Sequence, residues 1–336
     1  MALLEIENLS VEFPSAMGVG RAVDRVSLTV SEGEVVGIVG ESGAGKSLAM
    51  LAVMGLVPYP GRITADRLAF DGRDLLSLAA RERRALASKS MAMIFQDPMA
   101  SLNPCFTVGF QLTESLRVHE RMSRATARRR AIELLEQVGI PAAESRLRAF
   151  PHQLSGGMNQ RVMIAIAIAC RPRLLIADEP TTALDVTIQA QILDLLRALQ
   201  RERGMALALV THNMGILADT AHRVVVMYAG QIVEERDAAG LFRAPQHPYT
   251  AALLAAQPER DDQRRLATIP GAMPGLNDRP TGCRFSARCG YATERSRSVE
   301  PDIRPWMDGD VRCHYPLGDA DRDRRIAADG PLGAQP

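Results

Sequence analysis

The stretch that decides the fold is Gly40-Glu41-Ser42-Gly43-Ala44-Gly45-Lys46-Ser47. It fits the pattern of a phosphate-binding loop, and the apolar run Val35–Val39 before it indicates a buried strand that feeds the loop and a following helix. Glycines let backbone N–H groups close around phosphate oxygens, and the helix N-terminus adds partial positive charge. We therefore expect Lys46 to reach the β- and γ-phosphates of a nucleotide and Ser47 to bind Mg²⁺.

Two adjacent carboxylates, Asp178 and Glu179, follow the apolar run 174–177. They stand at the carboxyl end of a predicted strand, which is the edge of an α/β sheet where ligands bind. We expect Asp178 to hold the magnesium shell and Glu179 to accept a proton from an attacking water. His212 follows the next predicted strand, 206–210, at the same edge, so it is a candidate for orienting the water or for acid–base catalysis.

A second candidate anion site lies between residues 154 and 160, directly before an apolar helix. Its hydroxyl group, glycines and helix N-terminus are features that bind anions. Because it is far from Lys46 in the sequence, the simple physical inference is that it binds the nucleotide of another subunit. The residues concerned are Leu154, Ser155, Gly156, Gly157 and Gln160.

The remaining pattern predicts an α/β fold with a mostly parallel core sheet. Apolar alternation in two phases indicates an antiparallel strand with a bulge at 3–13 and a second strand near 23–30. Helix formers dominate 103–153, and short apolar runs return at 174–177 and 206–210, on either side of a helix at 187–203. A hairpin near 224–233 is expected to close the core. We place the nucleotide-binding domain at 1–245, with a helical insert at about 100–160, a Cys- and Pro-rich C-terminal extension held by local contacts at 246–320, and a disordered tail at 321–336.

Composition excludes several classes of function. Hydrophobic residues make up 46% of the 336 and charged residues 24%, which is typical of a folded globular protein. The 40 Lys and Arg against 39 Asp and Glu give no bulk attraction for nucleic acid. The longest apolar run, 162–170, is too short to cross a bilayer, so we expect membrane functions to require partners. Residues 1–10 do not resemble a secretory signal, and five cysteines indicate a reducing cytosol.

These elements, in this order and spacing, resemble the ATP-binding cassette (ABC) ATPases, a family of P-loop NTPases. Gln96 in Ile94-Phe-Gln-Asp-Pro98, Asp185 in Ala183-Leu-Asp-Val186 and the aromatic Phe13 add to the resemblance. In such proteins two subunits sandwich two ATP molecules head to tail. The resemblance implies that Ser155 and Gly157 complete the partner's site, that Phe13 stacks on adenine, and that Gln96 joins the magnesium site and senses the γ-phosphate.

A narrower resemblance, to the peptide/nickel import group and most of all to dipeptide permeases, covers nearly the whole chain. It is carried by the stretches 55–61 and 96–104, by His247-Pro-Tyr-Thr250 and by the cysteine-bearing tail. It implies a peripheral subunit at the cytoplasmic face of the inner membrane. Its implied partners are a second, different ATPase subunit, two permease subunits and an extracytoplasmic peptide-binding protein. An oligopeptide or nickel importer remains the alternative.

Departures from the family pattern occur at Asn159 and Asn213, which replace no phosphate or metal ligand, and at Ser296. Relatives place a cysteine at the position of Ser296, and such tails can hold an iron–sulfur cluster. This chain keeps three thiols, and a serine hydroxyl is a poor ligand for soft metals. The tail therefore leaves three alternatives: a labile cluster, a zinc site completed by His314, or three reduced thiols with no metal. The thiols are those of Cys283, Cys289 and Cys313.

Two other classes compete with the importer subunit. A soluble cassette ATPase that acts on ribosomes or DNA typically has tandem cassettes or long coiled-coil insertions, and this sequence shows neither. A catalytically silent regulatory subunit is opposed by the presence of Lys46, Glu179 and His212 together.

Overall fold

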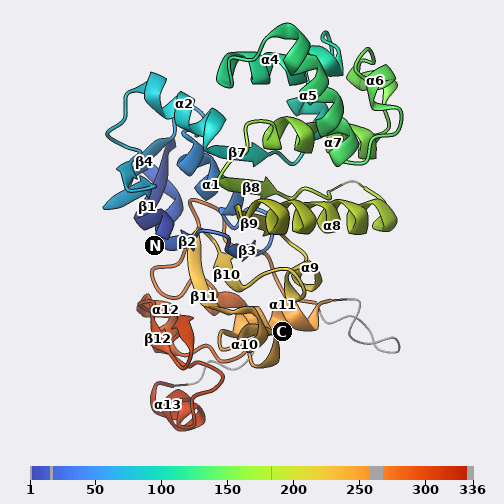
Figure 1. Ribbon diagram of the computed structural model, residues 1–336. Coiled ribbons are helices and arrows are strands. Elements are labelled where there is room, and N and C mark those ends of the chain that lie inside the picture. The colour runs from blue at the N-terminus through green and yellow to red at the C-terminus, as the bar shows by residue number, and fades with distance from the viewer. Residues whose placement is uncertain (1, 16–17, 183, 258–267, 331–336) are drawn as a thin grey trace. The chain divides into compact units, whose positions relative to one another are not determined.

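The computed structural model describes residues 2–15, 18–182, 184–257 and 268–330 (Figure 1). The chain divides into two compact units. One unit is formed mainly by Phe70–Val210. The other combines Leu4–Thr29, Val35–Ala69 and the described residues after 210. In the first unit the elements are β6 (Arg73–Asp74), α2 (Ala80–Lys89), β7 (Met91–Ile94), α3 (Pro98–Ser101), α4 (Val108–His119), α5 (Arg124–Gln137), α6 (Ala143–Arg146), η1 (Pro151–Gln153), α7 (Gly156–Ile168), β8 (Leu174–Asp178), α8 (Val186–Arg203) and β9 (Ala206–Thr211).

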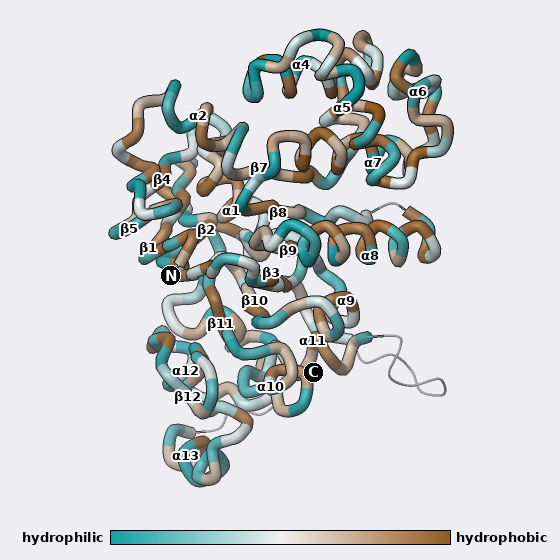
Figure 2. The backbone as a smooth tube through the Cα atoms, viewed as in Figure 1, coloured by the Kyte–Doolittle hydropathy of each residue, from teal (hydrophilic) through white to brown (hydrophobic). Residues whose placement is uncertain are grey.

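Parallel strands form the core of the first unit. β7, β8 and β9 pair in parallel, with Ile176 opposite both Met93 and Ala208. Every residue of β8 and β9 is buried, as expected of parallel strands covered on both faces. Helix α8 is amphipathic, as the alternation of brown and teal along it in Figure 2 shows. These strands and α8 confirm the sequence prediction.

The helical insert consists of α4 to α7, drawn in green in Figure 1. Its core uses the face predicted from the sequence, because Ala131, Leu134, Leu135 and Val138 are fully buried. The long helices begin at hydroxyl caps: the side chains of Thr107, Ser123 and Ser155 accept hydrogen bonds from the first turns of α4, α5 and α7.

The second unit contains strands of two different sheets, together with the loop at residues 40–47. Its elements are β1 (Ala2–Ser15), β2 (Gly18–Ser31), β3 (Val35–Val39), α1 (Lys46–Met54), β4 (Arg62–Thr64), β5 (Arg67–Phe70), α9 (Met214–Ala218), β10 (Arg223–Tyr228), β11 (Gln231–Asp237), α10 (Ala238–Arg243), α11 (Pro248–Ala255), η3 (Ser286–Arg288), α12 (Glu294–Ser298), β12 (Arg304–Trp306), β13 (Gly309–Val311) and α13 (Arg322–Ala328).

β1 lies between β2 and β5 and also pairs with β4. The two phases of its sequence have a local cause: Asn8 has a φ of 51°, between buried Ile6 and Leu9. Asparagine tolerates this left-handed conformation, which reverses the alternation along the strand.

β10 and β11 form the predicted hairpin, with a turn at Ala229 and Gly230, both at positive φ. The expectation that this hairpin closes the core is wrong. β11 also pairs with β13, which pairs with β12, so the order in this unit is β12-β13-β11-β10-β3. The C-terminal extension therefore adds strands to the sheet rather than resting on local contacts alone. Backbone pairing of this kind has no signature in the weakly periodic tail.

The disordered tail predicted at 321–336 is a further correction. Residues Arg322–Ala328 form helix α13, fixed by Arg325, which pairs with Asp319 at 2.6 Å and donates to the His314 carbonyl. The last six residues of that prediction lie outside the described ones. Among the described helices, none is both long and apolar enough to span a membrane.

Candidate nucleotide-binding site

The loop from Gly40 to Ser47 connects β3 to α1, as predicted. Its glycines are required by the backbone. Gly45 has a φ of 97°, and a Cβ there would lie 3.0 Å from the carbonyl oxygen of Ala22. At Gly40 a Cβ would collide with the carbonyl of Met227. The loop is thus a tightly curled backbone that ends at the N-terminus of a nine-residue helix.

Lys46 lies across this loop. Its side chain is buried, with 4% of the residue exposed, and Nζ donates to the carbonyl oxygens of Gly40 at 2.7 Å and Glu41 at 3.0 Å. A buried ammonium held by backbone carbonyls can exchange these partners for phosphate oxygens at little cost. Ser47 follows on the first turn of α1.

The first unit brings Gln96 and Glu179 together. Oε2 of Glu179 accepts hydrogen bonds from Gln96 Nε2 at 3.1 Å and from Thr182 Oγ1 at 2.9 Å. Glu179 has a φ of 46°, and its N–H donates to the Val210 carbonyl at 2.9 Å. Such backbone strain persists only where the surroundings fix it, and here it turns the carboxylate at the end of β8. Sequence reasoning missed Thr182, whose signal is a hydroxyl three residues beyond Glu179.

Asp178 is the last residue of β8 and is 6% exposed. β9 runs beside β8 with Val210 opposite Asp178, and His212 follows two residues later with an exposed side chain. Asn213 caps the short helix α9, since its Oδ1 accepts from Gly215 N at 2.8 Å. Asn213, which departs from the family pattern, therefore serves to cap this helix.

The stretch from Leu154 to Gln160 begins helix α7. Ser155 is exposed, and its Oγ accepts from Met158 N at 3.3 Å, while Gln160 is buried. Asn159 is buried too, and Nδ2 donates to the Pro151 carbonyl at 3.0 Å. Asn159 therefore fixes the approach to the helix, whose N-terminus stays open to solvent at Ser155.

Two further predicted residues occupy defined positions. Asp185 caps α8, with Oδ1 accepting from Ile188 N at 2.9 Å, although Ala183 of the same stretch lies outside the described residues. Phe13, near the end of β1, is partly exposed, and its ring lies against Gly61.

Comparisons with known proteins decide the family. The chain is 59% identical over 324 residues to the dipeptide transport ATP-binding protein DppD of Escherichia coli (strain K12), covering 96% of this chain and 99% of the relative. This chain belongs to the ABC transporter family. The family model "ABC transporter" matches residues 23–182, and the model "Oligopeptide/dipeptide transporter, C-terminal region" matches residues 233–295.

Other relatives agree. DppD of Haemophilus influenzae is 55% identical, over 95% of this chain and 97% of its own, and the oligopeptide transport ATP-binding protein OppD of Bacillus subtilis is 48% identical, over 90% and 85%. Among solved structures, the ATP-binding cassette MJ0796 bound to ADP and Pi matches with a TM-score of 0.64 and 29% identity, over 70% of this chain and 98% of that one. The chain is an ATP-hydrolysing subunit of an ABC transporter.

The ABC transporter fold implies ATP and Mg²⁺, and the residues of this chain fit both. The loop at 40–47 is a cradle with no room for a Cβ at Gly40 and a tight, left-handed backbone at Gly45, and it carries a buried ammonium. The hydroxyl of Ser47 and the carboxylate of Asp178 are both hard oxygen ligands, the kind that Mg²⁺ prefers.

Three of the five cysteines of this ABC transporter subunit, Cys283, Cys289 and Cys313, line one small cavity of about 20 Å³ together with Ser296 and His314. Burial raises the pKa of all three thiols, that of Cys289 to about 12, and so favours the protonated form. Ser296 is engaged in capping α12, since its Oγ accepts from Thr293 N at 3.3 Å. His314 Nε2 lies 2.9 Å from the Val299 carbonyl oxygen.

These donors do not fit a cluster bound by four thiolates, because three thiols and an occupied hydroxyl fall one soft ligand short. Over the described part of the chain, no group of three or more His, Cys, Asp or Glu side chains is arranged to hold a metal ion.

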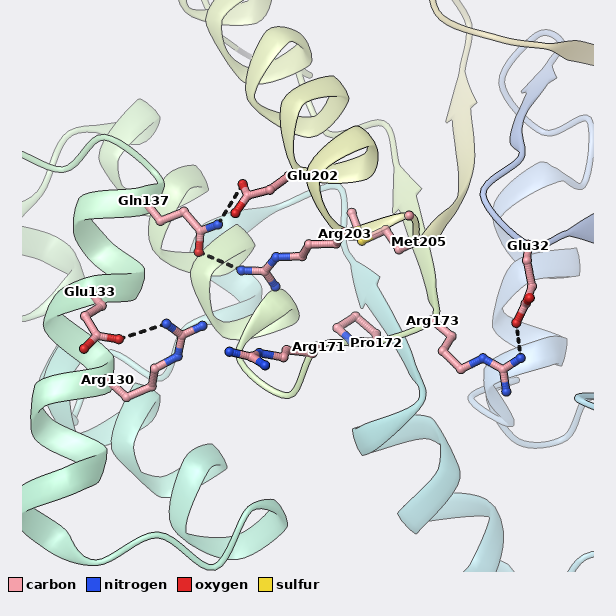
Figure 3. A pocket seen from close by; sticks show the side chains of 11 residues that line it. Glu32, Arg130, Glu133, Gln137, Arg171, Pro172, Arg173, Glu202, Arg203 and Met205 are labelled. Atoms are coloured by element: carbon pink, nitrogen blue, oxygen red, sulfur yellow. Dashed lines mark hydrogen bonds and ion pairs between the residues drawn. The ribbon is translucent and has the colours of Figure 1, made fainter.

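A cavity of about 640 Å³ lies at the amino ends of β8 and β9, lined by Arg173 and Met205 (Figure 3). Its charged groups are largely paired: Arg130 contacts Glu133 at 2.9 Å, and Arg203 donates to Gln137 at 2.6 Å. Because Asp178 and Glu179 stand at the opposite end of β8, this cavity is separate from the candidate site.

Proposed function

We propose that the chain energises the uptake of dipeptides or short peptides from the cytoplasmic face of the inner membrane. The observation that carries this proposal is the 59% identity, over nearly the full length of both chains, to a dipeptide transport ATP-binding protein. The lower identity of 48% to an oligopeptide transport ATP-binding protein makes oligopeptides the second candidate. Nickel uptake is the remaining alternative within the group.

The proposed chemistry is ATP hydrolysis with Glu179 as the general base. Water attacks the γ-phosphorus, Glu179 takes a proton from that water, and the bond to ADP breaks to release phosphate and ADP. The hydrogen bonds from Gln96 and Thr182 support this role because they orient the carboxylate. His212 orients the water or carries a proton.

The proposed nucleotide contacts divide among the predicted residues. Gly40 to Ser47 bind the phosphates, and Phe13 stacks on adenine. Magnesium, when bound, neutralises the phosphate charge, and Ser47, Gln96 and Asp178 would hold it.

We assign the stretch from Leu154 to Gln160, together with Asp185, to the ATP held by a partner subunit. The exposed Ser155 at the N-terminus of the 13-residue helix α7 supports this, since such an end attracts phosphate. The partner is a second, related ATPase, so the working unit is a heterodimer.

Coupling to two permease subunits is assigned to the helical insert at about 100–160 of a cassette that spans residues 1–245. Gln96 contacts Glu179 and immediately precedes this insert, so a change at the reacting end of β8 passes directly to it. The insert also exposes a stacked aromatic pair, Phe106 and Phe110, with ring centroids 4.5 Å apart. Residues 246–320 form the extension, and an extracytoplasmic protein delivers the peptide.

The test is transport by the complete complex in membrane vesicles. Labelled dipeptides, a labelled tetrapeptide and nickel ion are offered to complexes with the unmodified chain and with Glu179→Gln. ATP-dependent dipeptide uptake that is lost in Glu179→Gln is the expected result. Uptake of the tetrapeptide in place of dipeptides would favour the second candidate, uptake of nickel instead would overturn the peptide assignment, and uptake without ATP would overturn the function.

A further inference from the structure

An arginine of the C-terminal region grips the phosphate-binding loop. Arg288 is paired with Glu41 through both carboxylate oxygens, Nη1 to Oε2 at 2.7 Å and Nη2 to Oε1 at 2.9 Å. The Arg288 side chain is only 5% exposed, and Nε donates to the Pro270 carbonyl at 2.8 Å. The hydrogen bonds to Glu41 raise the pKa of Arg288, so this buried group stays charged. A planar fork that meets a carboxylate in this way fixes both partners in position.

Glu41 is held through its backbone as well. Its N–H donates to the hydroxyl of Tyr249 at 2.9 Å, and its carbonyl accepts from Lys46 Nζ at 3.0 Å. Tyr249 belongs to α11 and is fully buried, packed edge-on against Tyr228 with ring centroids 4.6 Å apart. The Glu41 carbonyl also accepts from Ala44 N at 3.1 Å. Residues 246–320 therefore supply two of the groups that hold Glu41, the Tyr249 hydroxyl and the Arg288 guanidinium.

The later part of the loop, at Ala44, contacts the β10–β11 turn, and this turn is itself bound by an arginine of the C-terminal extension. The Ala44 carbonyl accepts from Gly230 N at 2.8 Å. The neighbouring Ala229 carbonyl accepts from Arg284 Nη1 at 2.6 Å. Arg284 also pairs with Asp24, and its side chain is 9% exposed. Buried arginines of the C-terminal extension therefore support both parts of the loop: Arg288 binds Glu41 directly, and Arg284 binds the turn that contacts Ala44.

We propose that the C-terminal region sets the conformation of the phosphate-binding loop, with Arg288 and Tyr249 as positioning residues that hold Glu41 in place. The inference rests on the proposed assignment of residues 40–47 to ATP phosphates. When Lys46 turns to phosphate, the Glu41 carbonyl loses the hydrogen bond from Lys46 and keeps the one from Ala44 N. The grip of Arg288 and Tyr249 is independent of Lys46, so the loop keeps the shape that binds phosphate and less ordering is needed on binding.

Two substitutions separate positioning from plain electrostatics. Arg288→Ala removes a positive charge near the loop, so both effects weaken ATP binding. Glu41→Gln removes a negative charge, so electrostatics alone predicts tighter binding, whereas loss of the two-oxygen grip predicts weaker binding. If either substitution lowers the fraction of molecules whose loop has the phosphate-binding conformation to about a tenth, the Kd for ATP rises about tenfold.

The experiment measures the Kd of a fluorescent ATP analogue for the full chain, together with kcat and KM of the assembled transporter. We expect both single variants to raise Kd and KM about tenfold with kcat within about twofold, since the reacting groups are untouched. Arg288→Lys keeps the charge without the fork, and we expect an intermediate Kd. The double variant should bind no more weakly than either single one, because both remove the same contact. Arg325→Ala, which removes the ion pair to Asp319 in the same region, is the matched control and should leave the Kd unchanged.

Tighter or unchanged binding by Glu41→Gln would overturn the proposal, as would additive losses in the double variant. Thermal unfolding of each variant is followed alongside, and Arg288→Lys keeps the test decisive if Arg288→Ala does not fold. Lys46→Ala is measured in parallel. Binding that survives Lys46→Ala would refute the assignment of the loop and with it the positioning role. Binding lost in Lys46→Ala but unchanged in Arg288→Ala and Arg288→Lys would refute the positioning role alone.

Discussion

Replacing Glu179 by glutamine separates proton transfer from the architecture around it. In the structure one oxygen of Glu179 accepts both hydrogen bonds, from Gln96 at 3.1 Å and from Thr182 at 2.9 Å. An amide oxygen in the same place can accept both bonds, and glutamine has nearly the same shape. The loop at the end of β8 should therefore survive, and only the group that takes the proton is lost.

The size of the effect follows from that loss. A positioned general base contributes about 10²- to 10⁴-fold to a rate. We therefore expect kcat for ATP hydrolysis to fall by at least about a hundredfold, which is about 3 kcal/mol or more on the barrier. ATP affinity should change by less than about twofold, because Lys46 and the loop at 40–47 are untouched.

The assay is phosphate release by the assembled transporter at saturating ATP, with nucleotide binding measured separately. Thr182→Val is the matched control, because it removes one hydrogen bond but keeps the carboxylate. Loss of a bond worth about 1 kcal/mol should lower kcat about fivefold. A Glu179→Gln complex that hydrolyses ATP within about twofold of the unmodified rate would refute the role of Glu179.

Three further outcomes are expected. Ser155→Arg should stop turnover at the partner's site and spare the site of Lys46; mixed complexes in which only the Lys46 site fails would contradict this. Protein purified without oxygen should carry fewer than four iron atoms per chain, with more in Ser296→Cys, as iron and sulfide analysis can check; a full, oxygen-stable four-iron cluster in the unmodified chain would contradict the reading of Ser296. Asp24→Asn should lower the free energy of unfolding by about 3 kcal/mol at neutral pH, because Arg284 is left buried without its carboxylate. Burial would raise the pKa of Asp24, but the guanidinium groups around it, that of Arg284 foremost, outweigh burial and hold the pKa below its usual value. This stabilisation is present above the unfolded-state pKa of about 4 and is lost as the pH falls through the folded-state pKa, so denaturant titrations of the two proteins should converge in acid; a difference that persists there would contradict the ion-pair origin.

Local signals in the sequence predict the place of the loop at 40–47 and the core strands well. A Cβ at Gly40 or Gly45 would meet backbone atoms, and the buried runs formed by β3 and by residues 174–177 of β8 are continuous and apolar. Such features depend on a few neighbouring residues, so a single sequence is enough to recognise them. The contact between Gln96 and Glu179 was less accessible, because it joins positions 83 residues apart.

The fold of the C-terminal extension could not be predicted from the sequence. Its order comes from buried charges, such as Arg284 against Asp24 and Arg288 against Glu41, whose partners are 260 and 247 residues away. Isolated arginines in a polar, irregular segment have the composition of a solvated surface. Helix α13 was missed for the same reason, since Arg325 is held by Asp319 and by a backbone carbonyl rather than by an apolar face.

The pairing of β13 with β11 also bears on how the chain behaves in solution. A cassette cut after residue 245 would present the outer backbone groups of β11, a seven-residue strand, as a template for another chain. With residues 246–330 present, the last of the described strands in that row is β12, which is three residues long and contains Pro305, a residue without an N–H to donate. The extension thus closes this side of the sheet with an edge strand that pairs poorly with other chains. Shortened forms of the chain should therefore aggregate, even where their loop at 40–47 remains folded.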